Sequence, residues 1–272
     1  MNLTDTHTHL YWDSFRDDLD QVLKRAKNAG LTYIINIGVD VEKSQKALNQ
    51  AQKLSTSELQ IFSSIAIHPE EAIRYSSDES IHTDISRLEE TFKSDPKTVV
   101  AVGECGLDFL PQWIPNPEAK KMQIKLFQAQ IELAKKLNLP LIVHCRDDRF
   151  KDPDNCEAWD KVIEMTKDHF GIYHCYSGLP KTTDYLLQIT NFYVSFAGNL
   201  TYPQNKYLLE AAKIIPLDRI VLETDCPFLP PQSKRGQRNE PANVLDLAKM
   251  IAEIKGITLE EVAEQTSENV RQ

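Results

Sequence analysis

The sequence predicts an α/β protein built as a (β/α)8 TIM barrel, and three observations support this prediction. The chain has 272 residues, close to the roughly 250 that such barrels typically need. Short apolar runs alternate along it with longer stretches in which apolar residues recur at helical spacing. Histidines and carboxylates follow many of the short runs directly. This alternation implies a parallel sheet, for which a doubly wound open sheet is the competing architecture. We expect one domain, residues 1–272.

The short apolar runs are the expected strands. They cover residues 3–10, 33–39, 61–67, 99–103, 141–145, 171–176, 192–196 and 220–223. The first run is the most informative, because side chains alternate between the two faces of a strand. That alternation places Asp5, His7 and His9 on one face. Two imidazoles one pleat apart can converge on a divalent ion, whereas a polar strand with surface histidines is the plain alternative.

The longer amphipathic stretches are the expected helices. They cover residues 17–29, 41–54, 81–92, 117–138, 157–167, 181–189, 204–214 and 242–254. In the fourth, Ile124, Phe127 and Ile131 recur at helical spacing, and Pro117 suits the first turn of a helix. A last helix over 259–270 is expected as an extra element. Eight strands each followed by a helix match the count of a closed barrel.

Charge and composition narrow the class of protein. The chain carries 31 basic and 40 acidic residues, a net charge of −9, which argues against a broad basic face that coats duplex nucleic acid. An enzyme that takes a nucleic-acid end into a local positive site stays possible. We find no secretory signal and no apolar run approaching the roughly 18 residues of a membrane span. A cytoplasmic protein without a membrane partner is therefore expected, and a monomer is our expectation for its assembly.

Cysteine usage disfavours a disulfide framework or a zinc ribbon, because the five cysteines form no C-x-x-C pair. Four of them directly follow a candidate ligand: Cys105, Cys145, Cys175 and Cys226. On a strand the neighbour of an inward residue points outward, where a reduced cysteine packs as a small hydrophobe. Catalysis by a nucleophilic cysteine is thus the weaker interpretation.

Candidate metal ligands follow the expected strands, at the end where barrel enzymes place their catalytic groups. The set comprises His7, His9, His68, Glu104, His144, His174, Glu223 and Asp225. Core histidines with ordinary hydrogen-bond partners would explain one or two such placements, not five. Since buried carboxylates are costly unless they are paired or bound to a metal, a metal site explains the set best.

The number of ligands favours two ions, because a catalytic zinc takes about three protein ligands and keeps one position open. In a binuclear site the ions lie about 3.5–4 Å apart. We expect one ion on His7, His9 and Asp225, the other on His144 and His174, and Glu104 as the bridge. The residual positive charge would suit phosphoester hydrolysis. Imidazole ligands favour Zn²⁺ or Mn²⁺ over Mg²⁺, which prefers oxygen ligands but stays possible.

Five motifs taken together resemble the TatD family of metal-dependent hydrolases. They are DTHTH at 5–9, GECGLD at 103–108, PLIVHCR at 140–146, HCYSG at 174–178 and ETDCPFL at 223–229. Gly236 and the sequence NEP at 239–241 also resemble that family. Each motif is weak alone, but the ordered set spans nearly the whole chain. The stretch 149–155 departs from the family pattern by being longer and more charged.

The resemblance implies a barrel of the amidohydrolase type and a divalent-metal deoxyribonuclease that acts as a 3′→5′ exonuclease, with DNA single strands or 3′ ends as its partner. It makes His7, His9, Glu104, His144, His174 and Asp225 the metal ligands. His68 matches a family histidine near the substrate phosphate. Some members are described as D-aminoacyl-tRNA deacylases, so a hydrolase of another ester or amide, including a lactonase-like one, is the alternative. A binding protein with a vestigial site is the third hypothesis.

Roles can be assigned to several of these residues. Asp225 would orient the attacking water or accept its proton. His68 and Arg146 are candidates for contacting phosphate, and a salt bridge to a carboxylate is the alternative for Arg146. Glu223 and Asp108 would either orient a histidine ligand or serve as buried structural partners.

Two further groups are candidates for binding nucleic acid. Six aromatic residues near the strand ends could stack unpaired bases, although loop packing is the usual role of such residues: Trp12, Phe109, Trp113, Tyr176, Tyr202 and Phe228. Lys234, Arg235 and Arg238 offer a local positive patch in the proline-rich segment 227–241. Solvated loop charge is the alternative for these three.

Overall fold

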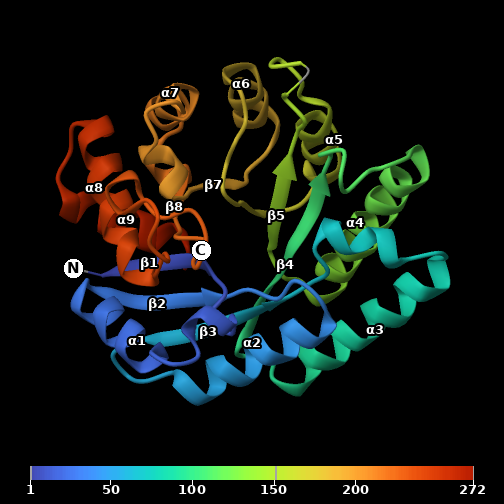
Figure 1. The fold of residues 1–272 in the computed structure, drawn as a ribbon, viewed down its shortest axis with the longest axis horizontal. Helices are drawn as coiled ribbons and strands as arrows, with labels where there is room; N and C mark the ends of the chain where they lie inside the picture. Colours follow the sequence, from blue (N-terminus) through green and yellow to red (C-terminus); the bar gives the residue numbers. More distant parts are fainter. Residues whose placement is uncertain (1, 151, 272) are drawn as a thin grey trace.

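All eight expected strands form in the computed structural model, which describes residues 2–150 and 152–271. They make one parallel sheet, with the strands in the order of the chain (Figure 1). The strands are β1 (Leu3–Thr8), β2 (Leu31–Asn36), β3 (Gln60–Ile65), β4 (Val99–Asp108), β5 (Leu141–Arg146), β6 (Gly171–Tyr173), β7 (Tyr193–Phe196) and β8 (Ile220–Leu222).

The sheet curves until its first and last strands meet, so the prediction of a barrel is confirmed. The order of a doubly wound sheet would reverse at a switch point, whereas here each strand pairs with the next along the chain. Closure occurs just beyond β8, where Thr8 pairs with Cys226. The backbone N–H of His9 donates to the Cys226 carbonyl and that of Asp225 to the His7 carbonyl, both at 2.9 Å.

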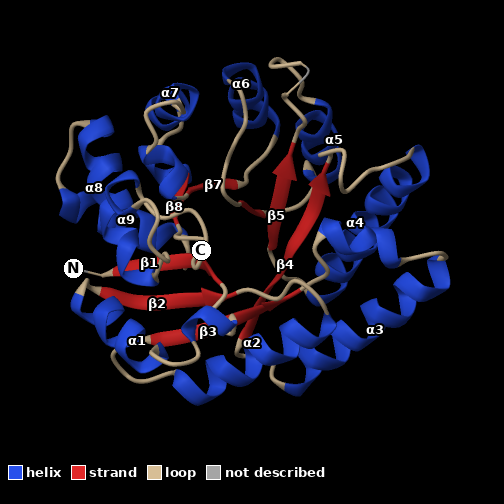
Figure 2. Cartoon of the chain, viewed as in Figure 1, coloured by secondary structure: helices blue, strands red, loops and turns tan. Residues whose placement is uncertain are grey.

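Helices surround the strands on the outside of the barrel (Figure 2). Among the described residues the α-helices are α1 (Leu19–Asn28), α2 (Val41–Leu54), α3 (Asp78–Ser94), α4 (Pro117–Leu137), α5 (Glu157–Thr166), α6 (Pro180–Ile189), α7 (Lys206–Ile214), α8 (Val244–Lys255) and α9 (Leu259–Asn269). Their ends lie within a few residues of the expected ones. Capping explains the ends of α4: Asn116 accepts from the backbone N–H of Ala119, Pro117 fills the first turn, and Asn138 ends the helix at φ 53°.

Several strands differ from the predicted bounds, and three of the differences concern His9, Glu104 or His174. β1 ends at Thr8, one residue before His9, and β6 ends at Tyr173, one residue before His174. β4 instead continues past Glu104 to Asp108, with a shift of register against β5 between Gly103 and Cys105. Such a bulge re-aims a side chain. Alternation alone therefore does not describe how these ligands are presented.

The extra helix α9 covers the junction of β1 and β8. The Thr4 hydroxyl donates to the Ser267 hydroxyl at 3.2 Å, and the Asn269 amide donates to the Ile220 carbonyl at 2.7 Å. The Ser267 hydroxyl in turn donates to the Asn2 carbonyl at 2.9 Å. These bonds attach the C-terminal helix to the first and last strands, and α9 lies beside β1 in Figure 1.

Aliphatic and aromatic side chains fill the space between the strands and the helices. Trp159 of α5 and Tyr173 of β6 are fully buried and meet edge to face, 5.6 Å between ring centroids. In the described part of the chain, no helix combines the length and the apolar character needed to cross a bilayer.

Candidate metal centre

A cavity of about 700 Å³ opens at the carboxyl ends of the strands. Its lining includes His9, His68, Glu104, His144, His174 and Asp225, and His7 lies fully buried directly beneath them, 3.2 Å from Glu104. The candidate ligands predicted from the sequence thus come together in one place, although they derive from six different strands or strand ends. Barrel enzymes place their active sites at this end.

The Glu104 carboxylate lies at the centre of the group. Its Oε1 is 2.8 Å from His174 Nε2 and 2.9 Å from His144 Nδ1. Its Oε2 is 3.2 Å from His7 Nε2 and 3.9 Å from His9 Nε2. The two oxygens therefore face two different pairs of histidines, which is the arrangement that a bridging carboxylate requires.

Asp225 lies on the same side of Glu104 as the β1 histidines. Its Oδ1 is 3.5 Å from His9 Nε2 and 3.8 Å from His7 Nε2. The residue has a left-handed backbone, with φ 57°, which costs a non-glycine residue about 1–3 kcal/mol. The bond from its N–H to the His7 carbonyl fixes that turn, so the strained conformation aims the carboxylate at the histidines.

Tyr11 determines which nitrogen of His9 faces Glu104 and Asp225. The Tyr11 hydroxyl donates its one proton to the Ile37 carbonyl at 2.8 Å. It can therefore only accept from His9 Nδ1, which lies 3.2 Å away. Nδ1 of His9 then carries a proton, and the lone pair of a neutral ring is on Nε2, directed at the two carboxylates.

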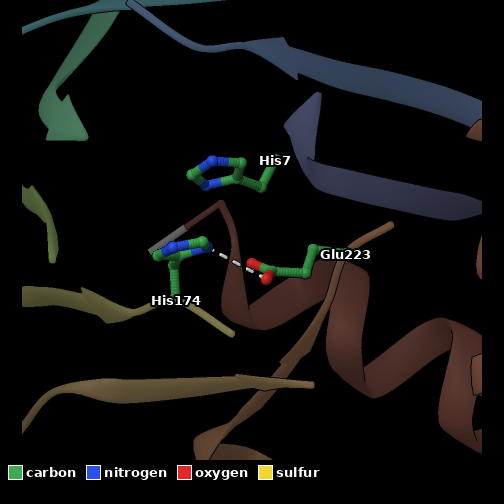
Figure 3. A group of neighbouring side chains, drawn as sticks. All are labelled: His7, His174 and Glu223. Carbon is green, nitrogen blue, oxygen red and sulfur yellow. Dashed lines mark hydrogen bonds and ion pairs between the residues drawn. The ribbon is translucent and has the colours of Figure 1, made fainter. Parts of the chain in front are cut away.

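Carboxylates orient His174 and His144 in the same way. Glu223 Oε1 lies 3.1 Å from His174 Nδ1 and accepts the Cys175 N–H at 2.8 Å, and Figure 3 shows the pair. Asp108 Oδ2 lies 3.1 Å from His144 Nε2. In both rings the nitrogen that faces Glu104 is the one not engaged by the second carboxylate. Carboxylates that orient metal-binding histidines commonly do so through the far nitrogen.

His68 differs from the other histidines. It precedes a 3₁₀ turn, Pro69–Arg74, and its Nδ1 accepts the backbone N–H of Glu70 at 3.2 Å. A neutral ring with Nδ1 as acceptor carries its proton on Nε2. That Nε2 lies 3.2 Å from Glu104 Oε1. Although His68, Glu104 and His144 are close enough to hold an ion, the tautomer makes His68 a hydrogen-bond donor.

His7 is enclosed by the other groups. Its ring stacks on that of His174, 3.9 Å between centroids and 17° between planes (Figure 3). Burial, with the neighbouring charge of His174, lowers the pKa of His7 to about 4. Its Nδ1 is buried with no hydrogen-bond partner among the described residues. His7 is therefore neutral at physiological pH, as a metal ligand must be.

The remaining pKa shifts identify where charge collects. Burial raises the pKa of Glu104, but the imidazoles of His174, His68 and His7 outweigh burial and hold it well below its ordinary value. Burial lowers the pKa of His174, but Glu104 and Glu223 outweigh it and hold that pKa well above its ordinary value. The same balance, with Asp108 and Glu104 as partners, raises the pKa of His144. Negative charge therefore collects on Glu104, which has imidazole nitrogens beside both of its oxygens, and this is the environment that a divalent cation requires.

These observations fit a two-ion site. One ion would lie among His7, His9, Asp225 and Glu104 Oε2, and the other among His144, His174 and Glu104 Oε1. A third close group, His7, His174 and Glu223, is a weaker candidate because Glu223 already accepts bonds from His174 and Cys175. Asp5, on the same face of β1, is not in the group. It accepts from the backbone N–H and hydroxyl of Thr224 at 2.9 and 2.6 Å, and so ties β1 to the end of β8.

Arg146 forms the salt bridge that was the alternative to phosphate binding. Its Nε and Nη2 lie 2.9 and 2.5 Å from Asp108 Oδ2, and Nη2 lies 3.7 Å from Glu70. Its side chain also lines the cavity and is 44% exposed. Asp108 thus connects Arg146 to His144.

The aromatic and basic groups are only partly where nucleic-acid binding would need them. Trp12 and Phe228 line the cavity, 5.6 Å apart and edge to face. Phe109, Trp113, Tyr176 and Tyr202 do not line it. Lys234 pairs with Asp246 at 2.9 Å and Arg238 with Asp18 at 2.7 Å, while Arg235 lies 4.5 Å from the centre of the Tyr202 ring.

The expectation that all four cysteines point away from the site is wrong for two of them. Cys145 and Cys175 line the cavity. For Cys175 the reason is local, because β6 ends at Tyr173 and Cys175 adopts φ 43°. Burial raises the pKa of both thiols well above its ordinary value. Thiols that stay protonated are poor nucleophiles, so catalysis by cysteine is still the weaker interpretation.

Two residues that contribute to the site, Tyr11 beside His9 and Arg149 in the cavity lining, were not singled out from the sequence. Tyr11 could have been found, because the alternation that groups His7 with His9 also includes Tyr11. Arg149 could not, because its contact with the Ser177 carbonyl joins two segments that no local pattern relates.

Comparisons with known proteins agree with this geometry. A model of the family described as TatD related DNase matches residues 4–272. An uncharacterized metal-dependent hydrolase of Bacillus subtilis, YabD, is 36% identical, over 99% of this chain and 97% of its own. A 3′-5′ ssDNA/RNA exonuclease, TatD of Erwinia amylovora, is 31% identical, over 100% and 96%. The fold matches an uncharacterized amidohydrolase of Saccharomyces cerevisiae with a TM-score of 0.81, over 100% and 99%, at 18% identity.

Proposed function

The chain belongs to the TatD family of metal-dependent hydrolases, and on that premise we propose that it is a 3′→5′ exonuclease of single-stranded DNA that works with two divalent metal ions. One observation carries the proposal: the two oxygens of Glu104 face two separate pairs of histidines, at 2.8–2.9 Å on one side and 3.2–3.9 Å on the other. The exonuclease activity of a relative 31% identical over the whole chain supports the choice of substrate.

The ligands would be His7, His9 and Asp225 for one ion and His144 and His174 for the other, with Glu104 shared. Bound there, the ions would supply an activated water and positive charge against the phosphate oxygens. Since four of the seven ligand contacts come from imidazole nitrogen rather than from oxygen, Zn²⁺ or Mn²⁺ is favoured over Mg²⁺.

The other polar groups of the cavity have separable roles in this proposal. Asp225, which is partly exposed to the cavity, orients the attacking water and accepts its proton. His68 donates from Nε2 to a non-bridging phosphate oxygen, the role that its tautomer allows. Arg146 keeps Asp108 in place and, from its exposed side, contacts the phosphate.

The test uses single-stranded DNA labelled at its 5′ end, incubated with protein loaded with Zn²⁺, Mn²⁺ or Mg²⁺. We expect a metal-dependent ladder of products shortened from the 3′ end. The variant His7→Ala/His9→Ala should give no ladder. The matched control is His82→Ala/His169→Ala, which removes the two histidines that lie outside the cavity and should behave as wild type.

Two outcomes would contradict the proposal. Release of internal fragments from the same DNA would show that the enzyme is an endonuclease rather than an exonuclease. No cleavage by protein shown to hold two ions would indicate that the substrate is another ester or an amide, such as an aminoacyl-tRNA ester or a lactone.

A further inference from the structure

Three cationic side chains line the cavity, and they differ in whether a carboxylate of the chain pairs with them. Lys43 pairs with Asp40 at 2.7 Å, and Arg146 pairs with Asp108 and Glu70. Arg149 forms no ion pair with any described residue. Of the three, Arg149 is therefore the charge that the fold leaves available to a ligand.

The guanidinium of Arg149 is fixed in place by uncharged groups. Nη1 donates to the Ser177 carbonyl at 2.7 Å and Nε to the Asn155 carbonyl at 3.4 Å. Its carbon lies 5.8 Å from the centre of the Tyr207 ring. Nη2 is buried and has no hydrogen-bond partner among the described residues. A buried donor without a partner costs about 1–3 kcal/mol, and more when it is charged, so an acceptor is missing at Nη2.

A second unsatisfied group lines the same cavity. Asn199, in the 3₁₀ turn after β7, has a buried Oδ1 without a partner in the described part of the chain. Its Nδ2 lies 3.5 Å from Cys175 Sγ, so it belongs to the surroundings of the segment that follows His174. A ligand that satisfies both groups carries an anionic acceptor for Arg149 and a hydroxyl or amino donor for Asn199. A nucleotide carries both.

The position of Arg149 relates it to the metal centre. Ser177, which anchors Nη1, is three residues after His174, so at most about 11 Å of chain separates the two Cα atoms. His174 itself contacts Glu104 at 2.8 Å. A strand whose scissile phosphate lies at Glu104 would therefore bring a neighbouring phosphate within reach of Arg149.

We propose that Arg149, with Tyr207 beside it and Asn199 in the lining of the same cavity, forms a second phosphate subsite that binds the phosphate adjoining the scissile one. This inference rests on the proposed nuclease function and refines it: the enzyme would recognise two consecutive phosphates, only one of which reacts. Bidentate guanidinium contacts are well suited to phosphate. The subsite would favour oligonucleotides over esters with a single phosphodiester.

The test compares substrates with one phosphate and with several, in wild type and in Arg149→Gln. The first substrate is the p-nitrophenyl ester of thymidine 5′-monophosphate, and the second is an oligothymidylate of six nucleotides. We expect Arg149→Gln to lower kcat/KM on the oligonucleotide about 10- to 100-fold, as for loss of a hydrogen bond to a charged group. We expect kcat/KM on the ester to change less than twofold. Arg149→Lys should recover part of the loss. Arg87→Gln, on the outer surface of α3, is the control for charge.

A binding measurement separates this inference from the proposed function, because it requires no cleavage. By calorimetry, thymidine 3′,5′-bisphosphate should bind wild type at least tenfold more tightly than thymidine 5′-monophosphate, and Arg149→Gln should abolish that preference. The slope of log K against log salt for oligothymidylate should decrease in magnitude by about 0.7, the value for one phosphate of a single strand.

Equal losses on both substrates, or no loss on either, would overturn the subsite, as would equal binding of the two nucleotides by wild type. If wild type cleaves neither substrate, or only the ester, the nuclease proposal is contradicted. The calorimetric comparison of the bisphosphate with the monophosphate would then still test whether Arg149 binds a second phosphate. A melting temperature of Arg149→Gln far below that of Arg87→Gln, with equal losses on both substrates, would assign Arg149 to holding the loop.

Discussion

The floor of the cavity and the segment 227–241 both carry charged residues close to strand ends, yet the fold uses them differently. In the floor, the charges of Glu104 and Asp225 converge with imidazole nitrogens on a common space. In the segment, Lys234 and Arg238 are directed at Asp246 and Asp18. The difference teaches that a charge near a site is available to a ligand only where the chain has not already supplied its partner. Arg149 meets that condition within the cavity.

The largest effect should come from Glu104→Gln, which removes the charge shared by both halves of the floor. We expect kcat to fall about a thousandfold or more, since metal ions contribute several kcal/mol to stabilising the transition state and 1.36 kcal/mol is tenfold in rate. Metal content measured by mass spectrometry should fall in parallel. Glu90 is an exposed glutamate of α3, and the control variant Glu90→Gln should keep both its kcat and its metal content. Full metal content in Glu104→Gln would argue against a bridging role.

A smaller effect is expected from Glu223→Gln, which keeps the shape of the side chain that orients His174 but removes its charge. Residues in such positions typically contribute 10- to 100-fold to metal affinity. Competition with a chelating dye would measure the change, with Glu253→Gln on α8 as the control. An unchanged affinity would assign Glu223 to packing and to the backbone N–H of Cys175 alone.

The segment 227–241 should contribute little to binding nucleic acid. If Lys234 and Arg238 are occupied by their carboxylates, the triple variant Lys234→Ala/Arg235→Ala/Arg238→Ala should change the salt slope of oligothymidylate binding by no more than about 0.7, the value for one phosphate. Its melting temperature should fall. A change in the slope of about 1.4 or more, the value for two phosphates, would show that this segment does bind nucleic acid. It would then not differ from the cavity floor in the way described.

The smallest effect concerns the ion pairs that occupy this segment. Hydrogen bonds from Arg238 and Arg25 lower the pKa of Asp18, so the native state binds fewer protons there than the unfolded state does. The pairs therefore stabilise the native state above the unfolded pKa near 3.9, and that contribution is lost as the pH falls through the lower native pKa. Relative to Asp18→Asn, wild type should gain less than about 1 kcal/mol at pH 7, because solvent screens exposed pairs. Urea melts should show the gain declining once the pH falls below about 4; a gain that grows towards low pH would contradict this assignment.

The sequence allows the barrel and the candidate ligands to be predicted because both depend on local patterns. Apolar runs alternate with amphipathic ones, and His144 and His174 each follow such a run directly. The details that depend on contacts between distant segments could not be predicted. The bulge at Glu104 depends on the register of β4 against β5, and the partners of Lys234 and Arg149 depend on how separate loops meet. The aromatic residues show the same limit, since position near a strand end did not separate Trp12 from the fully buried Tyr176.

The central claim is that Glu104 lies between two metal ions, and anomalous diffraction from crystals soaked in Zn²⁺ tests it most directly. Data collected at the zinc absorption edge should show two peaks about 3.5–4 Å apart, one beside His7, His9 and Asp225 and the other beside His144 and His174. A single peak, or peaks away from Glu104, would contradict the account.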